Sequence, residues 1–105
     1  MADEHEQATS SAEESESGIT FLAFVLSLAH TTAVHFGDIP DPVSGTASAP
    51  NLEAAQQMID ILSLLEAKTR GNLTAEERQV LEQVLFELRM RYLEVNKPAS
   101  RIIMP

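Results

Sequence analysis

The chain has 105 residues, which is enough for one small domain, and it contains no cysteine. Disulfide bonds, thiolate metal sites and cysteine nucleophiles are therefore excluded, and the composition is typical of a reducing compartment. The formal charge is −9, from 16 acidic and 7 basic residues, and every Lys and Arg lies at or beyond position 68. Most of the surface should therefore repel nucleic-acid phosphates and anionic lipid headgroups.

Residues 1–17 contain six acidic side chains, no Lys or Arg, and no large apolar residue after Met1. Such a segment cannot bury enough apolar surface to offset its ordering entropy, so we predict a disordered acidic tail. The segment also lacks the basic region that opens a secretory signal, which favours a cytoplasmic protein.

Residues 19–36, ITFLAFVLSLAHTTAVHF, form a nearly continuous apolar run that is too long for a typical strand and predicts a helix. Gly37 and Pro40 are well placed to end it. A membrane span is disfavoured, because the run is short, its second half is polar and no basic residue flanks it. A helix that is apolar nearly all round must be covered on more than one side, which predicts an interface with a second subunit. The candidate interface residues are Phe21, Phe24, Val25, Leu28 and Phe36.

Residues 38–50 contain three prolines and predict a linker. Two amphipathic helices are expected beyond it, at 52–69 and 75–95, followed by a short tail at 97–105. The first of these helices has a main apolar face that Ile61 and Leu64 widen, and the second has an additional stripe of Phe86, Met90 and Leu93. The short connection predicts an antiparallel hairpin, so the fold class is all-α, with the 19–36 helix packed across the hairpin within a helical domain at 18–96.

The connection between these two helices, KTRGNLTAEE at 68–77, supports two readings. Asn72-Leu73-Thr74 matches an N-glycosylation acceptor, whereas Thr74 followed by Glu77 matches a helix capping box. Without a secretory signal the capping box is favoured, with Gly71 ending the preceding helix at positive φ.

Residues able to carry chemistry are sparse. His30 and His35 are five positions apart and do not converge on one side of a helix, so with Asp38 they make at most a weak metal or small-ligand site. No phosphate-binding glycine loop or nucleophile motif is present, and we expect neither catalysis nor a cofactor. A basic patch could form on the last helix from Arg78, Arg89 and Arg91, although solvated helix charge is the simpler explanation.

Several segments resemble a known family: FLAFVLSLAHTTAVHFG, NLEAA, MIDIL, EAKTRGNLTAEE and LRMRY. They are similar to domain-of-unknown-function family 1844, over about residues 19–95, and the most specific of them is KTRGNLT. The resemblance implies a small bacterial all-α protein of the cytosol, and it transfers no catalytic residue.

The function expected from the sequence is a non-enzymatic protein-interaction or adaptor module that forms a homo-oligomer, most simply a dimer. Two alternatives stay open. One is an RNA- or translation-associated protein that uses Arg78, Arg89 and Arg91, and the other is a weak metal or small-ligand binder at His30, His35 and Asp38.

Overall fold

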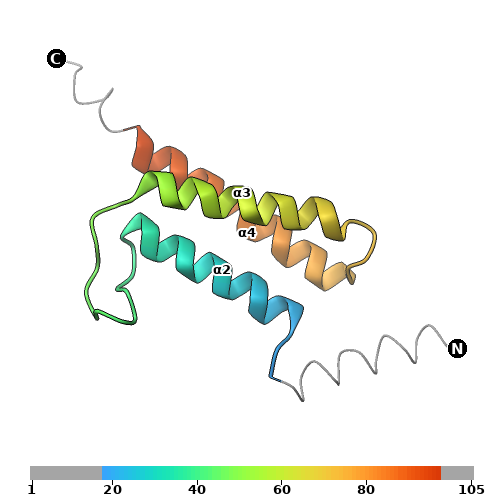
Figure 1. Ribbon diagram of the computed structural model, residues 1–105. Helices are drawn as coiled ribbons and strands as arrows, with labels where there is room; N and C mark the ends of the chain where they lie inside the picture. Colours follow the sequence, from blue (N-terminus) through green and yellow to red (C-terminus); the bar gives the residue numbers. More distant parts are fainter. Residues whose placement is uncertain (1–17, 98–105) are drawn as a thin grey trace, which may run out of the picture.

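The computed structural model describes residues 18–97, and the predicted tails at 1–17 and 98–105 lie outside this range. Three helices pack against one another, as the all-α prediction requires: α2 (Phe21–Phe36), α3 (Leu52–Thr69) and α4 (Ala75–Asn96). α3 and α4 form the predicted antiparallel hairpin, and α2 runs antiparallel to α3 (Figure 1).

α2 begins and ends at residues whose local chemistry favours a helix terminus. The Thr20 hydroxyl accepts a hydrogen bond from the Ala23 N–H at 2.9 Å, which satisfies one of the free donors of the first turn. Gly37 adopts φ +82° and ψ 13° at the other end. Its N–H donates to the Val34 carbonyl, and the Asp38 N–H donates to that of Ala33, which is a Schellman motif.

The 38–50 connection returns the chain to the end of α2. The Asn51 N–H donates to the His35 carbonyl at 2.7 Å, so α3 starts beside the last turn of α2. The Asn51 side chain accepts from the Ala54 N–H at 3.0 Å and caps α3. A Cβ atom at Gly37 would lie 2.6 Å from the Ser48 carbonyl oxygen. This residue must therefore be glycine both for its positive φ and for the close approach of the connection.

The corner between α3 and α4 differs in one detail from the prediction. Gly71 has the expected positive φ of +82°, but it does not cap α3 directly. Arg70 is already extended at φ −57° and ψ 130°, and the Asn72 N–H donates to the Thr69 carbonyl at 2.9 Å. These dihedral angles define a type II turn, which requires glycine at its third position.

The capping box expected at the start of α4 is present. The Glu77 N–H donates to the Thr74 hydroxyl at 3.1 Å, and the Thr74 N–H donates to the Glu77 carboxylate at 2.9 Å. The acceptor-like Asn72-Leu73-Thr74 run therefore lies in the turn and cap of the hairpin.

Each of the three helices contributes to a single core. Its one buried polar side chain among the described residues is Thr32, whose hydroxyl donates to the Leu28 carbonyl at 2.7 Å and is thus satisfied within α2. The apolar members are Val25, Phe36, Ala55, Ile59, Leu62, Leu81, Val84 and Leu85.

We expect Thr74→Ala to lower the free energy of unfolding by about 1 kcal/mol, because it removes the acceptor of the capping box. In a domain of this size that corresponds to a fall in melting midpoint of roughly 4–8 °C, measurable by circular dichroism at one protein concentration. Thr74→Ser should keep most of the cap. An unchanged midpoint in Thr74→Ala would contradict the energetic role of the cap.

Gly37→Ala should destabilise the protein more than Gly71→Ala, although both glycines have φ +82°. Both substitutions carry the penalty of placing a Cβ at positive φ, about 1–2 kcal/mol. Only Gly37→Ala also drives a Cβ into the Ser48 carbonyl, because nothing lies within 4 Å of the corresponding Cβ at Gly71. Urea titration of both variants measures the difference. Equal losses would show that the 38–50 connection can move away without penalty.

Candidate functional site

The five residues predicted at the α2 interface divide into two groups in the structure. Val25 and Phe36 are 0% and 2% exposed, so they belong to the core of the single chain and are not available to a partner. Phe21 and Leu28 are partly buried against that core. Phe24, at 46%, remains substantially exposed. The correction has a simple cause: α2 packs against both α3 and α4, and these two helices cover its most apolar side.

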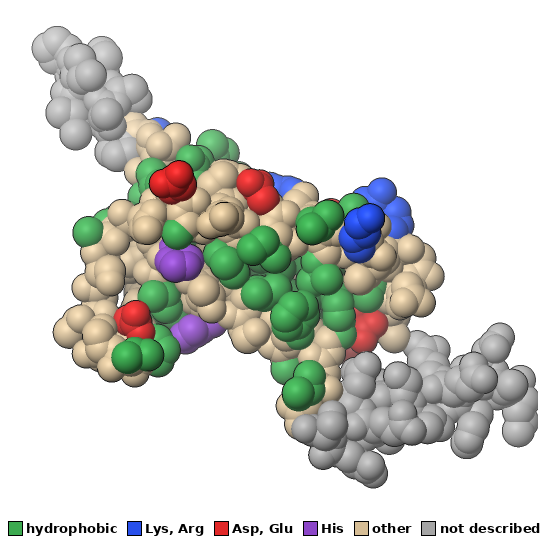
Figure 2. All heavy atoms as spheres, in the orientation of Figure 1, with side chains coloured by type: hydrophobic (Ala, Val, Ile, Leu, Met, Phe, Trp, Pro, Cys, Tyr) green, Lys and Arg blue, Asp and Glu red, His purple; other side chains and the backbone are tan. Residues whose placement is uncertain are grey.

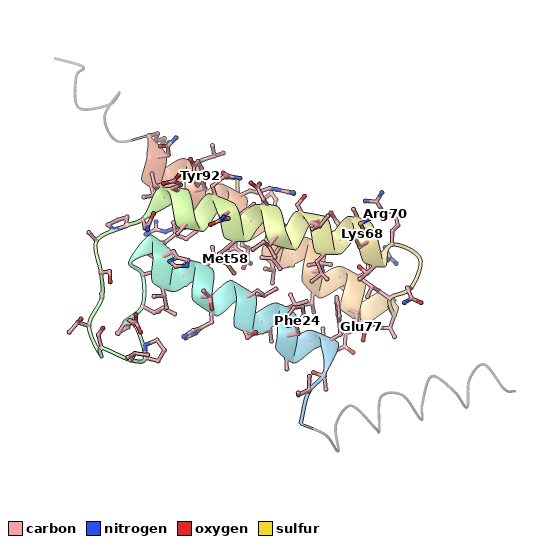
Figure 3. All side chains as sticks on the ribbon, viewed as in Figure 1. Phe24, Met58, Lys68, Arg70, Glu77 and Tyr92 are labelled. Carbon is pink, nitrogen blue, oxygen red and sulfur yellow. The ribbon has the colours of Figure 1, made fainter. Side chains whose placement is uncertain are left out.

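Exposed and half-buried apolar side chains nevertheless remain on α2 and α3, which pack against each other. On α3, Gln56 and Ser63 line a groove with Arg89 and Tyr92 of α4, whereas Met58 lies between α2 and α3 (Figure 3). We call this surface the α2–α3 face and define it by three residues from each helix. They are Phe24, Leu28 and Thr31 of α2, and Met58, Ile61 and Leu65 of α3.

The spacing of these six residues explains why they share a face. Each set of three is separated by three and four positions, so it forms one row along its helix. Met58 lies in the region between α2 and α3, and Phe24 lies on the first part of α2, near Glu77 at the start of α4 (Figure 3). Apolar side chains gather over the two helices on this side of the molecule (Figure 2). Ile61 is 43% exposed, which is close to the value for Phe24.

Arg91 is held in an ion pair that sequence reasoning missed. Its guanidinium donates to both carboxylate oxygens of Asp38, at 2.6 and 3.0 Å, and to Glu94 at 3.0 Å. The hydrogen bonds to Asp38, and secondly the one to Glu94, raise the pKa of Arg91 above its ordinary value. The pair joins the start of the 38–50 connection to α4. No sequence pattern indicates it, because its two residues are 53 positions apart.

The three arginines predicted as a basic patch do not act together. Arg91 is paired with Asp38 and Glu94, whereas Arg89 donates to the Ser63 hydroxyl at 3.1 Å. Positions 89 and 91 also lie on different sides of α4, because residues two positions apart in an α-helix point in directions that differ by about 200°. Arg78 is exposed near the α3–α4 corner, beside Arg70, Glu66 and Glu82. The acidic neighbours offset the positive charge there.

The histidines are not assembled into a metal site. Within residues 18–97, no three His, Cys, Asp or Glu side chains are grouped so that they could hold a metal ion. His30 is exposed, His35 is half-buried, and the Asp38 carboxylate is occupied by Arg91. The proposed ligand set of His30, His35 and Asp38 is therefore not supported, because its strongest ligand already neutralises a cation. None of the described helices is both long and apolar enough to cross a membrane.

The described part of the chain thus defines a class: a small all-α domain with an uncharged, partly exposed face and no assembled metal cluster. The chain belongs to the family described as domain of unknown function (DUF1844), whose model matches residues 18–94. No curated protein and no solved structure matches the chain.

Replacing Asp38 or Arg91 should have a small, salt-dependent effect on stability. Both side chains are partly exposed, and pairs of this kind contribute about 0.2–1 kcal/mol. We expect Asp38→Asn and Arg91→Gln to be non-additive in a double-mutant cycle followed by thermal unfolding, and the coupling should shrink in 1 M salt. The matched control is the exposed, hydrogen-bonded pair of Gln83 and Glu87 on α4. A substitution in this pair should be additive with Asp38→Asn. Full additivity of Asp38→Asn and Arg91→Gln would contradict the interaction.

Proposed function

We propose that this chain is a non-enzymatic, homo-oligomeric protein-interaction module, most simply a two-fold dimer, which associates through the α2–α3 face. The observation that carries the proposal is the exposure of Phe24 and Ile61 on two helices that pack together, in a surface whose six defining residues are all uncharged. Contiguous exposed apolar surface of this kind is typical of interfaces.

The energetics favour covering this face. Complete burial of a Phe or Ile side chain stabilises a structure by about 1.5–3 kcal/mol relative to exposure, and Phe24 and Ile61 each leave over two-fifths of that surface in water. In a symmetric dimer each interface residue occurs in both copies, so the free energy gained by burying it counts twice. The small size of the domain strengthens the argument, because a core of this size leaves much of its apolar surface uncovered.

The other sequence-based alternatives receive less support from the described residues. An RNA interface would need several free cations on one side, whereas Arg89 and Arg91 are hydrogen-bonded to α3 and to Asp38. The net charge of −9 also opposes binding to a phosphate backbone. The lack of cysteine supports a cytoplasmic setting for the module.

We expect Ile61→Gln to convert a two-chain species into a one-chain species at concentrations where the wild-type protein is dimeric. The substitution removes apolar burial from both copies and should raise the dissociation constant at least tenfold, while its 43% exposure makes it tolerable to the single chain. Light scattering over a dilution series gives the mass.

Met90→Gln is the matched control, because Met90 is 45% exposed but lies on α4, away from the α2–α3 face. This variant should keep the two-chain mass. A wild-type mass of one chain throughout the series would refute self-association. Dissociation by Met90→Gln, with Ile61→Gln unaffected, would instead place the interface on α4.

A further inference from the structure

We infer that a second copy of this chain covers the α2–α3 face with its α3 antiparallel to the first, in a register that places Glu53 of one copy against Lys68 of the other. This inference rests on the proposed self-association and adds the partner's orientation and the residues that select it. It follows from the arrangement of side chains along α3.

Two neighbouring rows run along the outer part of α3, and Glu53 and Gln57 of the second row also line a pocket with Tyr92 of α4. The first row contains the three α3 members of the α2–α3 face, preceded by the small residue Ala54. The second row lies next to the first around the helix and contains Glu53, Gln57, Leu64 and Lys68. Its first and last residues are exposed and charged. The acidic charge lies in the first turn of α3 and the basic charge in its last.

Both rows are symmetric about nearly the same point. Glu53 and Lys68 are equally distant from a point between residues 60 and 61, and the same is true of Gln57 and Leu64. The midpoint of Met58 and Ile61 lies between residues 59 and 60, one residue before that point. A two-fold axis beside residue 60 therefore opposes acid to base at both ends of α3 and Met58 to Ile61 in the middle. The ends of the interface are then joined by two equivalent ion pairs.

The positions of the apolar residues on α2 are consistent with the same two-fold axis. The hydrogen bond from the Asn51 N–H to the His35 carbonyl places these two positions level with one another. Because α2 and α3 are antiparallel and rise equally per residue, position 26 of α2 lies about level with position 60 of α3. The axis then opposes Phe24 to Leu28 of the second copy. The apolar residues of α2 are thus paired by the register that pairs the charges of α3.

The competing arrangements are disfavoured by charge. A parallel pairing of α3 would bring Glu53 against Glu53 and Lys68 against Lys68. The other exposed apolar row, Phe86, Met90 and Leu93 of α4, has a different difficulty. If Phe86 faced Leu93 of an antiparallel copy, Arg89 would approach its own equivalent and Glu87 would approach Glu94 of the other copy. The α3 register opposes unlike charges at both ends of the interface, although it also brings Asp60 towards its own equivalent beside the axis.

The test is a charge exchange followed by sedimentation equilibrium on the full chain. Glu53→Lys gives a chain with lysine at both positions, and Lys68→Glu gives a chain with glutamate at both. Each variant alone should dimerise roughly tenfold more weakly than the wild type, because two attractive pairs become repulsive. An equimolar mixture of the two variants should regain the wild-type affinity as a heterodimer.

Two features make this result specific. Glu53→Lys reduces the net negative charge, so a general electrostatic effect would strengthen association, whereas the proposed register weakens it. Glu87→Lys is the matched control: it makes the same change of charge on α4, away from the α2–α3 face, where Glu87 accepts a hydrogen bond from Gln83. It should not weaken the dimer.

The outcomes separate this register from the proposed function. If the wild type dimerises but neither single variant weakens it, or if the mixture fails to recover, the register is wrong and self-association stands. If the wild-type chain stays at one-chain mass, both fail together. Circular dichroism of each variant confirms that the helices are kept, since both charges also lie near helix ends where reversal is unfavourable.

Discussion

The packing of α2 against both helices of the α3–α4 hairpin is the interaction on which the rest of this structure depends. It buries Val25, Thr32 and Phe36 and completes the core around Leu62 and Leu81. A two-helix hairpin alone would leave one side of that core in water. The Schellman motif at Gly37, the hydrogen bond from Asn51 to His35 and the ion pair of Asp38 with Arg91 all hold α2 in this position.

The same packing decides which apolar residues are left for a partner. Once α2 has turned its most apolar side inward, the large apolar residues that it leaves exposed are Leu26 and, on the margin next to α3, Phe24. This margin lies beside the row of Met58, Ile61 and Leu65 on α3, and neither would be extensive alone. The candidate interface is therefore a product of two helices brought together, and we propose that the charged residues at the ends of α3 orient a second copy on it.

The local features were predictable from the sequence, and the side of α2 that the chain itself covers was not. Helix limits, the capping box of Thr74 with Glu77 and the glycine at position 71 all follow from chemistry within a few residues. By contrast, Val25 and Phe36 belong to the core, because an apolar run does not reveal which of its sides the chain itself will cover. The pairing of Arg91 was equally hidden, since Asp38 reaches it through the fold of the connection.

The sequence by itself determined that this protein is a small all-α domain with a tight hairpin, and the family to which it belongs, because periodicity, caps and turn residues act over short distances. Only the tertiary structure decided that α2 completes the core, that Arg91 is tied to Asp38, and that Phe24 and Ile61 remain exposed. The physical reason is that burial is a property of surfaces in contact, and these surfaces come from segments far apart in the chain.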